Sequence, residues 1–521
     1  MRKIVDNLGI KQIIAATFVL LTALGMTIGL TMNQSNFMKK PECLKMAITK
    51  IYDSYDPSKM LTTDHVFFIV NLGGQLVFSG ENNEIYGGYA KSWNVGQDKL
   101  VYTVHLRDDA KFSNGTPIRP LDVVLSLKRH ILFGATHMEL RSKLVGADQL
   151  QSIDDEIEGL KVTDKNSITF KLKFPDERFL FWLAFPELII LPENEARKPL
   201  DKISYQTSSG PFSLEKLTSS EAVLRKNPHF YDNHANAAEC FIVRGIEDPE
   251  VAVRSLESGD LDLIDYGAAF SPSFARLLNN DSFVSIAGED LALNYFIFNP
   301  RRTTMDSSTK RRAFSKRLSQ INLISYGEGD VFTRANQFLT ENHQGFLRPN
   351  EIQDVISAPV SDLDFTERFV ILIPEVFGSE IRKFLKDKLQ EHLEVDIDFV
   401  VYKEGEVLSA LKQNDWDAFY YLVGMAEKAT SILFGYHFKG DHPLYPFSDE
   451  VIKQNMEKIE FAENDQIRIE SYKAISRRLL SEAYIAPIAY FKWPVVMRSD
   501  LRFAQSNEFA FNRWLWRLEW K

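Results

Sequence analysis

The sequence has none of the short motifs that mark the common enzyme classes. A Gly-x-Ser-x-Gly nucleophile elbow, a Gly-x4-Gly-Lys phosphate loop, a Rossmann glycine fingerprint and a His-Glu-x-x-His zinc helix are all absent. Concentrated positive charge is also absent, because 61 Lys and Arg residues against 71 Asp and Glu residues give a net charge of -10. A nucleic-acid-binding surface needs a basic face. We therefore expect no nucleic-acid partner and none of these enzyme classes.

Histidine and acidic residues are present, but their spacing does not favour a catalytic or metal site. The closest histidine pairs, in HFYDNH and HFKGDH, are five residues apart, so neither pair lies on one face of a helix. Asp260 and Asp262 would share one face of a strand, but a helix end followed by a strand explains them more simply than acid–base chemistry. We expect no catalytic residue, no metal and no cofactor.

Cysteine is scarce, and its two copies have similar surroundings. Cys43 directly precedes the apolar run LKMAITKI, and Cys240 directly precedes FIVRGI. If these runs are neighbouring parallel strands, the two sulfur atoms lie side by side, within reach of a disulfide bond. Two alternatives stay open at this point: a disulfide, which an oxidising compartment would allow, and two free buried thiols.

One uncharged apolar run, Ile13 to Met32, stands near the N-terminus. At the helical rise it would extend over roughly 30 Å, which is about one hydrocarbon core. Arg2, Lys3 and Lys11 precede it, so the positive-inside rule places the N-terminus in the cytoplasm and the rest of the chain outside. The run predicts membrane contact, either as an uncleaved anchor or as a signal peptide, although it lacks a clean Ala-x-Ala cleavage site.

The remainder of the chain alternates strand and helix patterns. KLVYTVHLR and NSITFKLKF alternate apolar and polar residues and predict strands, with a helix that begins at Pro120 between them. AECFIVRGI, a helix that opens at Asp248-Pro249 and a further apolar run predict a βαβ unit. Residues 368–424 give strand, helix, strand, helix, strand, which predicts a second parallel sheet. The fold class is therefore α/β, with a strand-rich insert in the first unit.

Seven motifs in order carry a resemblance to a known family. They are DSYDP, GGYAKSWNV, YTVHLRDDAKFSNGTPIRPLDVVLSLKR, SSGPFSL, LRKNPHFYD, SLESGDLDLI and NYFIFNP. Together they resemble family 5 of the extracytoplasmic solute-binding proteins of ABC importers, which includes oligopeptide- and dipeptide-binding proteins. The resemblance implies a periplasmic-binding-protein-like fold of type II, in which two α/β lobes close on a ligand about a hinge.

The resemblance also implies a domain organisation and a role without covalent chemistry. The expected division is 1–40 as signal peptide or membrane anchor with linker, 41–67 with 206–290 and 486–521 as lobe one, 68–205 as the inserted strand-rich domain, and 291–485 as lobe two. The expected function is capture of a peptide or similar small solute by a monomer, which delivers it to a membrane permease. The expected location is the periplasm or cell exterior, with or without a membrane tether.

Candidate ligand-binding residues follow from the same resemblance. Family members often hold the α-ammonium of a peptide with an aspartate, and the matching segment here, VGMAEKAT, offers Glu427 as its only carboxylate and Met425 in place of a tryptophan. The other candidates, for which ordinary packing is the alternative, lie in loops after strands and at the hinge: Tyr52, Tyr55, Ser208 and Tyr295. Two further readings stay open, a membrane-tethered solute-sensing or interaction domain of the same fold, and a periplasmic hydrolase that lacks an evident nucleophile.

Overall fold

The computed structural model describes residues 42–521, apart from residues 60–61, 80–83, 135–137, 234–236, 266–270, 272, 288–291, 320, 322–331, 357–367, 378, 394, 404–405, 425–429, 439–443, 463 and 505–514. The apolar run Ile13 to Met32, predicted to contact a membrane, lies outside these residues. Among the helices that the structure does describe, none is long and apolar enough to cross a bilayer.

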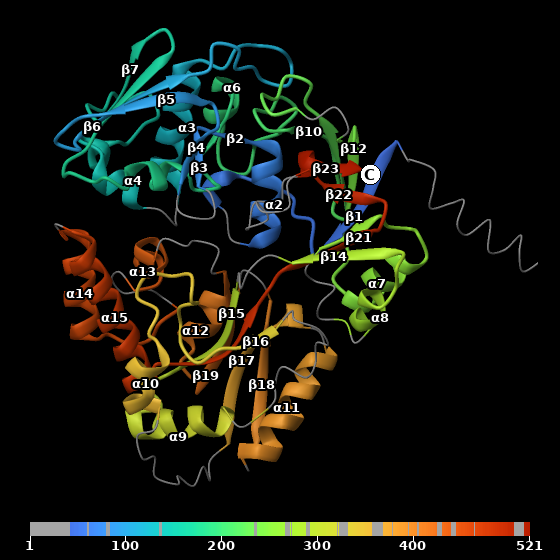
Figure 1. Cartoon of the computed structure of the whole chain (residues 1–521), viewed down its shortest axis with the longest axis vertical. Coiled ribbons are helices and arrows are strands. Elements are labelled where there is room, and N and C mark those ends of the chain that lie inside the picture. The colour runs from blue at the N-terminus through green and yellow to red at the C-terminus, as the bar shows by residue number, and fades with distance from the viewer. Residues whose placement is uncertain are drawn as a thin grey trace, which may run out of the picture.

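Lobe one is built on a seven-stranded sheet (Figure 1). Its strands in spatial order are β10 (Phe212–Leu217), β11 (Glu221–Lys226), β12 (Cys240–Gly245), β1 (Cys43–Ile48), β13 (Leu263–Ile264), β21 (Pro494–Arg498) and β14 (Phe283–Ala287). The three central strands β12, β1 and β13 are parallel. Helix α7 (Pro249–Glu257) connects β12 to β13, and Asp248 caps it by accepting the Glu250 N–H, which confirms the predicted βαβ unit.

The insert contains a four-stranded antiparallel sheet, ordered β5 (Ala90–Val95), β6 (Val101–Leu106), β8 (Ser167–Lys171) and β7 (Leu160–Asp164). The alternation read from the sequence is confirmed on β6, where Tyr102, Val104 and Leu106 are buried. They share one apolar core with Val123 and Leu127 of the long helix α3 (Pro120–Phe133). Shorter helices complete the insert: α4 (Met138–Lys143), α5 (Phe179–Leu183) and α6 (Glu193–Ala196).

Lobe two is built on a six-stranded sheet. Its strands in order are β16 (Phe332–Arg334), β20 (Ile485–Phe491), β15 (Ala292–Phe298), β19 (Ala418–Gly424), β17 (Phe369–Pro374) and β18 (Ile397–Tyr402). Strands β17, β18 and β19 are parallel as predicted, but β15 is antiparallel to β19 and β20, and β16 is antiparallel to β20. The predicted parallel arrangement of residues 368–424 is therefore confirmed, and β15, β16 and β20, which lie outside that range, add antiparallel strands at its edge.

Helices cover the lobe-two sheet, and some of them lie between this sheet and the insert. They are α9 (Ser308–Leu318), α10 (Pro349–Ile356), α11 (Ser379–Leu393), α12 (Val407–Lys412), α13 (Thr430–Phe438), α14 (Glu450–Glu460) and α15 (Asp465–Glu482). In Figure 1, α13, α14 and α15 lie on the part of lobe two beneath the insert.

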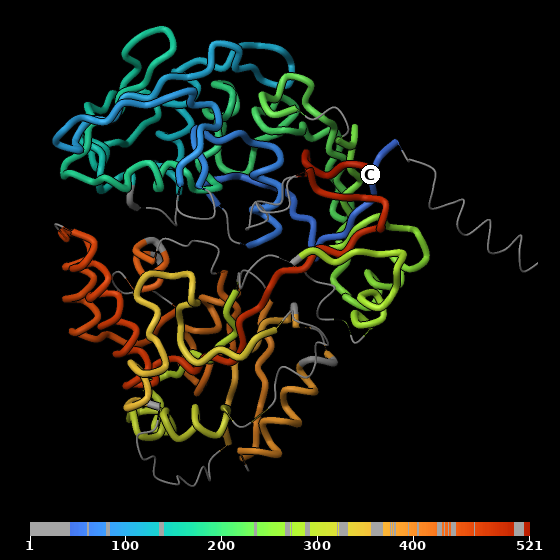
Figure 2. Tube along the Cα trace, viewed as in Figure 1, coloured from blue at the N-terminus to red at the C-terminus, as the bar shows by residue number. Residues whose placement is uncertain are grey.

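Two connections join the lobes, and they shift the predicted domain boundaries. In chain order, β14 of lobe one is followed by β15 of lobe two, and β20 of lobe two is followed by β21 of lobe one. Figure 2 shows the second of these connections in red. Strand β20 was assigned to lobe one from residue 486, yet its hydrogen bonds go to β15 and β16, so the second connection falls at Lys492 and Trp493. Helix α2 (Thr63–Leu72) was divided at residue 68, but Phe68 and Leu72 belong to the lobe-one core.

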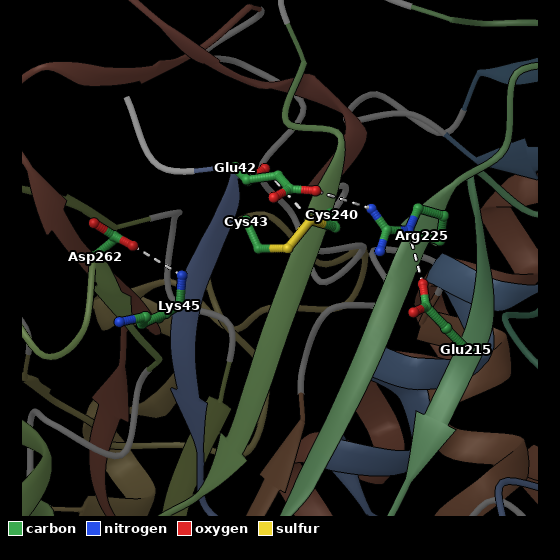
Figure 3. The surroundings of a disulfide bond; sticks show 7 residues. All are labelled: Glu42, Cys43, Lys45, Glu215, Arg225, Cys240 and Asp262. Carbon is green, nitrogen blue, oxygen red and sulfur yellow. Dashed lines mark hydrogen bonds and ion pairs between the residues drawn. A yellow bond between two sulfur atoms is a disulfide. The ribbon is translucent and has the colours of Figure 1, made fainter. Parts of the chain in front are cut away.

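A disulfide bond between Cys43 and Cys240 lies at the start of strands β1 and β12 (Figure 3). The two residues are direct register partners, with 4.5 Å between their Cα atoms. The parallel pairing of the two apolar runs is the arrangement that the disulfide prediction required. Of the two alternatives left open by the sequence, the structure has the disulfide and not the free thiols.

Candidate functional site

The loop after β1, residues 49–56, and the start of α2 form the part of lobe one that we take as the candidate site. Strand β1 ends at Ile48, and ligands of open α/β sheets lie beyond the carboxyl ends of the strands. Figure 1 shows α2 on the side of lobe one that faces lobe two. Thr62 caps this helix by accepting the His65 N–H, and the Asp64 carboxylate accepts the backbone N–H of Lys50 at 2.9 Å. These bonds fix the loop against the helix.

Tyr55 anchors this loop from below. Its ring is buried and stacks on Phe68 with 3.9 Å between ring centroids. Its hydroxyl oxygen accepts the Tyr52 N–H at 3.0 Å, and its carbonyl accepts the Tyr205 hydroxyl at 2.9 Å. Burial raises the pKa of Tyr55 above its ordinary value, so the hydroxyl stays neutral. In this conformation the predicted binding residue Tyr55 shapes the loop and presents no surface to a ligand.

Tyr52 is the partly exposed aromatic residue of the loop. Its ring lies on the imidazole of His65 with 4.2 Å between centroids, and the Lys50 ammonium lies 5.5 Å from the Tyr52 centroid. The Thr62 hydroxyl is 2.9 Å from His65 Nδ1. Burial lowers the pKa of His65 to about 4, so a neutral imidazole supports Tyr52 at neutral pH. We call Tyr52 and His65 the aromatic platform.

A buried ion pair closes the far end of the same loop. The Arg129 guanidinium of α3 donates to the Asp56 carboxylate, and both side chains are buried. The Asp56 carboxylate also accepts the backbone N–H groups of Ser58 at 3.1 Å and Asp201 at 3.0 Å. The pair therefore joins the insert to the loop that carries the aromatic platform.

Ser208 joins the insert to lobe one. Its N–H donates to Ser113 Oγ at 3.0 Å, its carbonyl accepts the Ser113 N–H at 2.8 Å, and its hydroxyl donates to the Phe212 carbonyl. Ser113 belongs to the turn that reverses at Gly115, where φ is +83°. Ser208 is buried and all of these partners lie within the chain, so its role in this structure is architectural.

Tyr295 of β15 is buried in the core of lobe two. Its hydroxyl lies 2.6 Å from the Tyr445 hydroxyl, which lies 3.0 Å from His437 Nδ1 on α13. Opposite it, β19 ends at Gly424. The two remaining candidates, Met425 and Glu427, follow directly and lie outside the described residues.

The structure thus separates the predicted site residues. Tyr52 is partly exposed next to His65, whereas Tyr55, Ser208 and Tyr295 support the backbone around it or the lobe-two sheet. Sequence reasoning missed His65, although the Thr-Thr-Asp-His start of a helix shortly after a site loop was a usable signal. Among the described residues, no group of three His, Cys, Asp or Glu side chains could hold a metal ion.

Two α/β lobes, joined by two connections and carrying an inserted domain on the first, define a two-lobed binding protein. A family model for bacterial extracellular solute-binding proteins, family 5 Middle, matches residues 84–351. The chain belongs to this family, which consists of solute-binding proteins and not of enzymes.

Curated relatives and solved structures agree with this assignment. The probable D,D-dipeptide-binding periplasmic protein DdpA of Escherichia coli is 26% identical over 242 residues, 45% of this chain and 44% of that protein. The periplasmic oligopeptide-binding protein OppA of Haemophilus influenzae is 24% identical over 306 residues, 56% of each chain. The chain thus spans about half the length of these relatives. NikA from Brucella suis, solved in complex with Fe(III)-EDTA, shares the fold with a TM-score of 0.76 at 18% identity, over 92% of this chain and 100% of that one.

Proposed function

We propose that the chain is the extracytoplasmic substrate-binding subunit of an ABC importer, which captures peptides or similar small solutes between its lobes and delivers them to a membrane permease. The observation that carries the proposal is that the chain passes from the lobe-one sheet to the lobe-two sheet between β14 and β15 and returns between β20 and β21, because two lobes connected in this way can rotate about the connections. Membership of solute-binding family 5 supports the role, and the names of the peptide-binding relatives favour peptides. NikA shares this fold but was solved in complex with Fe(III)-EDTA and not with a peptide, so the fold by itself does not select the ligand.

The proposed ligand site has one part on each lobe. On lobe one, the aromatic platform offers the Tyr52 ring as an apolar surface with a hydrogen-bonding hydroxyl. On lobe two, Glu427 would pair with the cationic end of a peptide, and Met425 would give an adaptable apolar contact. Tyr55 and Ser208 would support the backbone of the lobe-one part of the site, and Tyr295 would support the sheet of the lobe-two part.

The proposal extends to the location of the protein. The segment Ile13 to Met32 would direct export and then either remain as a membrane tether or be cleaved. The chain would act as a monomer in the periplasm or at the cell exterior, with permease subunits as partners. A tethered sensing domain is the alternative, and it predicts unchanged peptide uptake when the gene is deleted, whereas an importer subunit predicts lost uptake.

Ligand-dependent stabilisation tests the function. The full chain in detergent is heated with a mixture of di- to pentapeptides that carry free amino termini, and separately with Fe(III)-EDTA. A ligand specific to the folded state at 100 times its Kd stabilises that state by about 2.7 kcal/mol, which moves the unfolding midpoint upward. Mass spectrometry of small molecules that co-purify with the chain identifies the natural ligand. An unchanged midpoint in the peptide mixture would count against peptide binding.

Substitution of Glu427 tests the charge pairing. Glu427→Gln should weaken binding of free-amine peptides roughly 10- to 50-fold, because a hydrogen bond to a charged group is lost, and should leave N-acetylated peptides unaffected. Glu391→Gln is the matched control, since that exposed carboxylate pairs with Lys388 within α11. Equal affinity of wild type and Glu427→Gln for free-amine peptides would remove Glu427 from the site.

A further inference from the structure

Two aromatic residues from different lobes meet in spite of being exposed. Phe174 of the insert and Phe461 at the end of α14 are 62% and 66% exposed, the highest values among the large exposed apolar side chains in the described part of the chain. Their rings lie edge to face, with 6.3 Å between centroids and 90° between planes. Edge-to-face aromatic pairs attract one another beyond their buried area. The contact joins the two lobes directly.

An ion pair lies beside this aromatic contact. Arg468 Nη2 of α15 donates to Glu177 Oε1 of the insert at 2.9 Å, across a sequence separation of 291 residues. The guanidinium is held in place on its own lobe, because Nε donates to Asp465 at 3.0 Å and Nη1 donates to the Ala462 carbonyl at 3.2 Å. Arg468 is buried, whereas the Glu177 side chain is exposed. Lobe two therefore presents a fixed donor to the insert.

The insert holds its half of the contact equally firmly. Phe174 and Glu177 flank Asp176, which is buried below them. The Asp176 carboxylate pairs with Lys143 at 2.7 Å and accepts the Trp182 Nε1–H at 3.3 Å, and its carbonyl accepts the Tyr102 hydroxyl. These bonds hold the segment of the insert that carries Phe174 and Glu177.

The contact lies far from the connections about which the lobes would rotate. Helices α14 and α15 lie on the side of lobe two away from the β14–β15 and β20–β21 connections (Figure 1). A weak attraction far from a pivot opposes opening at the point where opening separates the lobes most. Charge and aromatic contacts also respond differently to salt, because only the ion pair is screened.

We propose that Phe174, Glu177, Phe461 and Arg468 form a rim clasp that biases the lobes toward closure before any ligand arrives and slows opening afterwards. The inference rests on the proposed function, in which closure retains a solute, and it adds residues outside the ligand site that set how long the solute is held. Because a ligand binds more tightly when its competent state is already populated, the clasp would raise apparent affinity without touching the ligand.

The test measures closure in the ligand-free full chain. Spin labels on Lys161→Cys and Lys453→Cys, both exposed and on opposite lobes, report the inter-lobe distance distribution. Phe174→Ala or Phe461→Ala should lower the ratio of closed to open molecules about three- to tenfold, and the double variant should lower it no further. Glu177→Gln should lower the ratio about two- to fivefold at low salt and leave it unchanged at 1 M salt.

Matched controls separate the clasp from general effects of surface substitution. Val400→Ala trims an exposed apolar side chain on β18, and Glu158→Gln breaks an exposed ion pair with Lys171 inside the insert. Both controls should leave the distance distribution unchanged. Additive effects of the two phenylalanine substitutions, or distributions equal to wild type, would overturn the clasp. The measurement uses no ligand, so it remains valid even if the chain turns out not to bind peptides. If the chain binds peptides but the substitutions leave the closed population unchanged, the clasp is overturned and the proposed function stands.

Discussion

Removal of the disulfide should destabilise lobe one and the insert together. The Cys43–Cys240 bond closes a loop of 197 residues, which contains the whole insert. In the chain-entropy account, the lost entropy of the unfolded chain is 2.1 + 1.5R ln n, about 18 cal/mol/K for this loop, or ~5 kcal/mol at 25 °C. With a shift of about 2 °C per kcal/mol for a unit of this size, the unfolding midpoint should fall by about 10 °C.

The assay is differential scanning calorimetry of the full chain and of a Cys43→Ala/Cys240→Ala double variant, each with and without a reductant. The wild type with reductant should match the double variant, and reductant should leave the double variant unchanged, which is the internal control. Lobe two has its own sheet and lies outside the closed loop, so its transition should not move. A shift below about 2 °C in the transition of lobe one would refute the reasoning, because strand pairing between β1 and β12 would then suffice to hold the loop.

Two further predictions concern buried charge and titration. Arg129→Met removes the cationic partner of the buried Asp56 carboxylate and should lower the free energy of unfolding, measured in urea titrations, by about 3–5 kcal/mol. The double variant Arg129→Met/Asp56→Asn should lose clearly less stability, because it has no buried charge at this place. Equal losses in the two variants would contradict the ion-pair explanation. Folding lowers the pKa of His65 from 6.5 to about 4. Between these two pH values the unfolded chain binds a proton that the folded chain does not bind. The free energy of unfolding should therefore fall by about 3 kcal/mol as the pH falls from 6.5 to about 4. His65→Gln should flatten that part of the pH profile of the unfolding midpoint, and an unflattened profile would assign the loss to other groups.

Local patterns predicted the elements of this fold well. The alternation around Tyr102, the Asp248 cap of α7 and the strand–helix–strand order of residues 368–424 all correspond to observed elements. Strand direction and lobe membership were harder, because both depend on partners far away in the sequence. Ile485 to Phe491 is an apolar run that either sheet could accept, and its position in lobe two follows from pairing with β15.

The candidate site was less predictable than the fold for a related reason. A tyrosine after a strand has the same sequence signature whether its ring faces a ligand or the core. Tyr55 and Tyr295 are buried, while Tyr52, three residues before Tyr55, is partly exposed. The rim clasp left no sequence signal, because Phe174 and Phe461 are neighbours only after both lobes have folded.

The β20–β21 connection also determines when the protein can finish folding. Strand β21 separates β13 from β14, and β20 separates β15 from β16, so β14 and β16 have no other strand partner in the described sheets. Because the chain is made from its N-terminus onward, both sheets stay incomplete, with unpaired strand edges, until residues 485–498 have been made. Pairs such as Phe283 with Arg498 bridge long stretches of chain, which makes the final step slow. Both sheets thus become complete in the same late step, when β20 and β21 pair with strands that were made earlier.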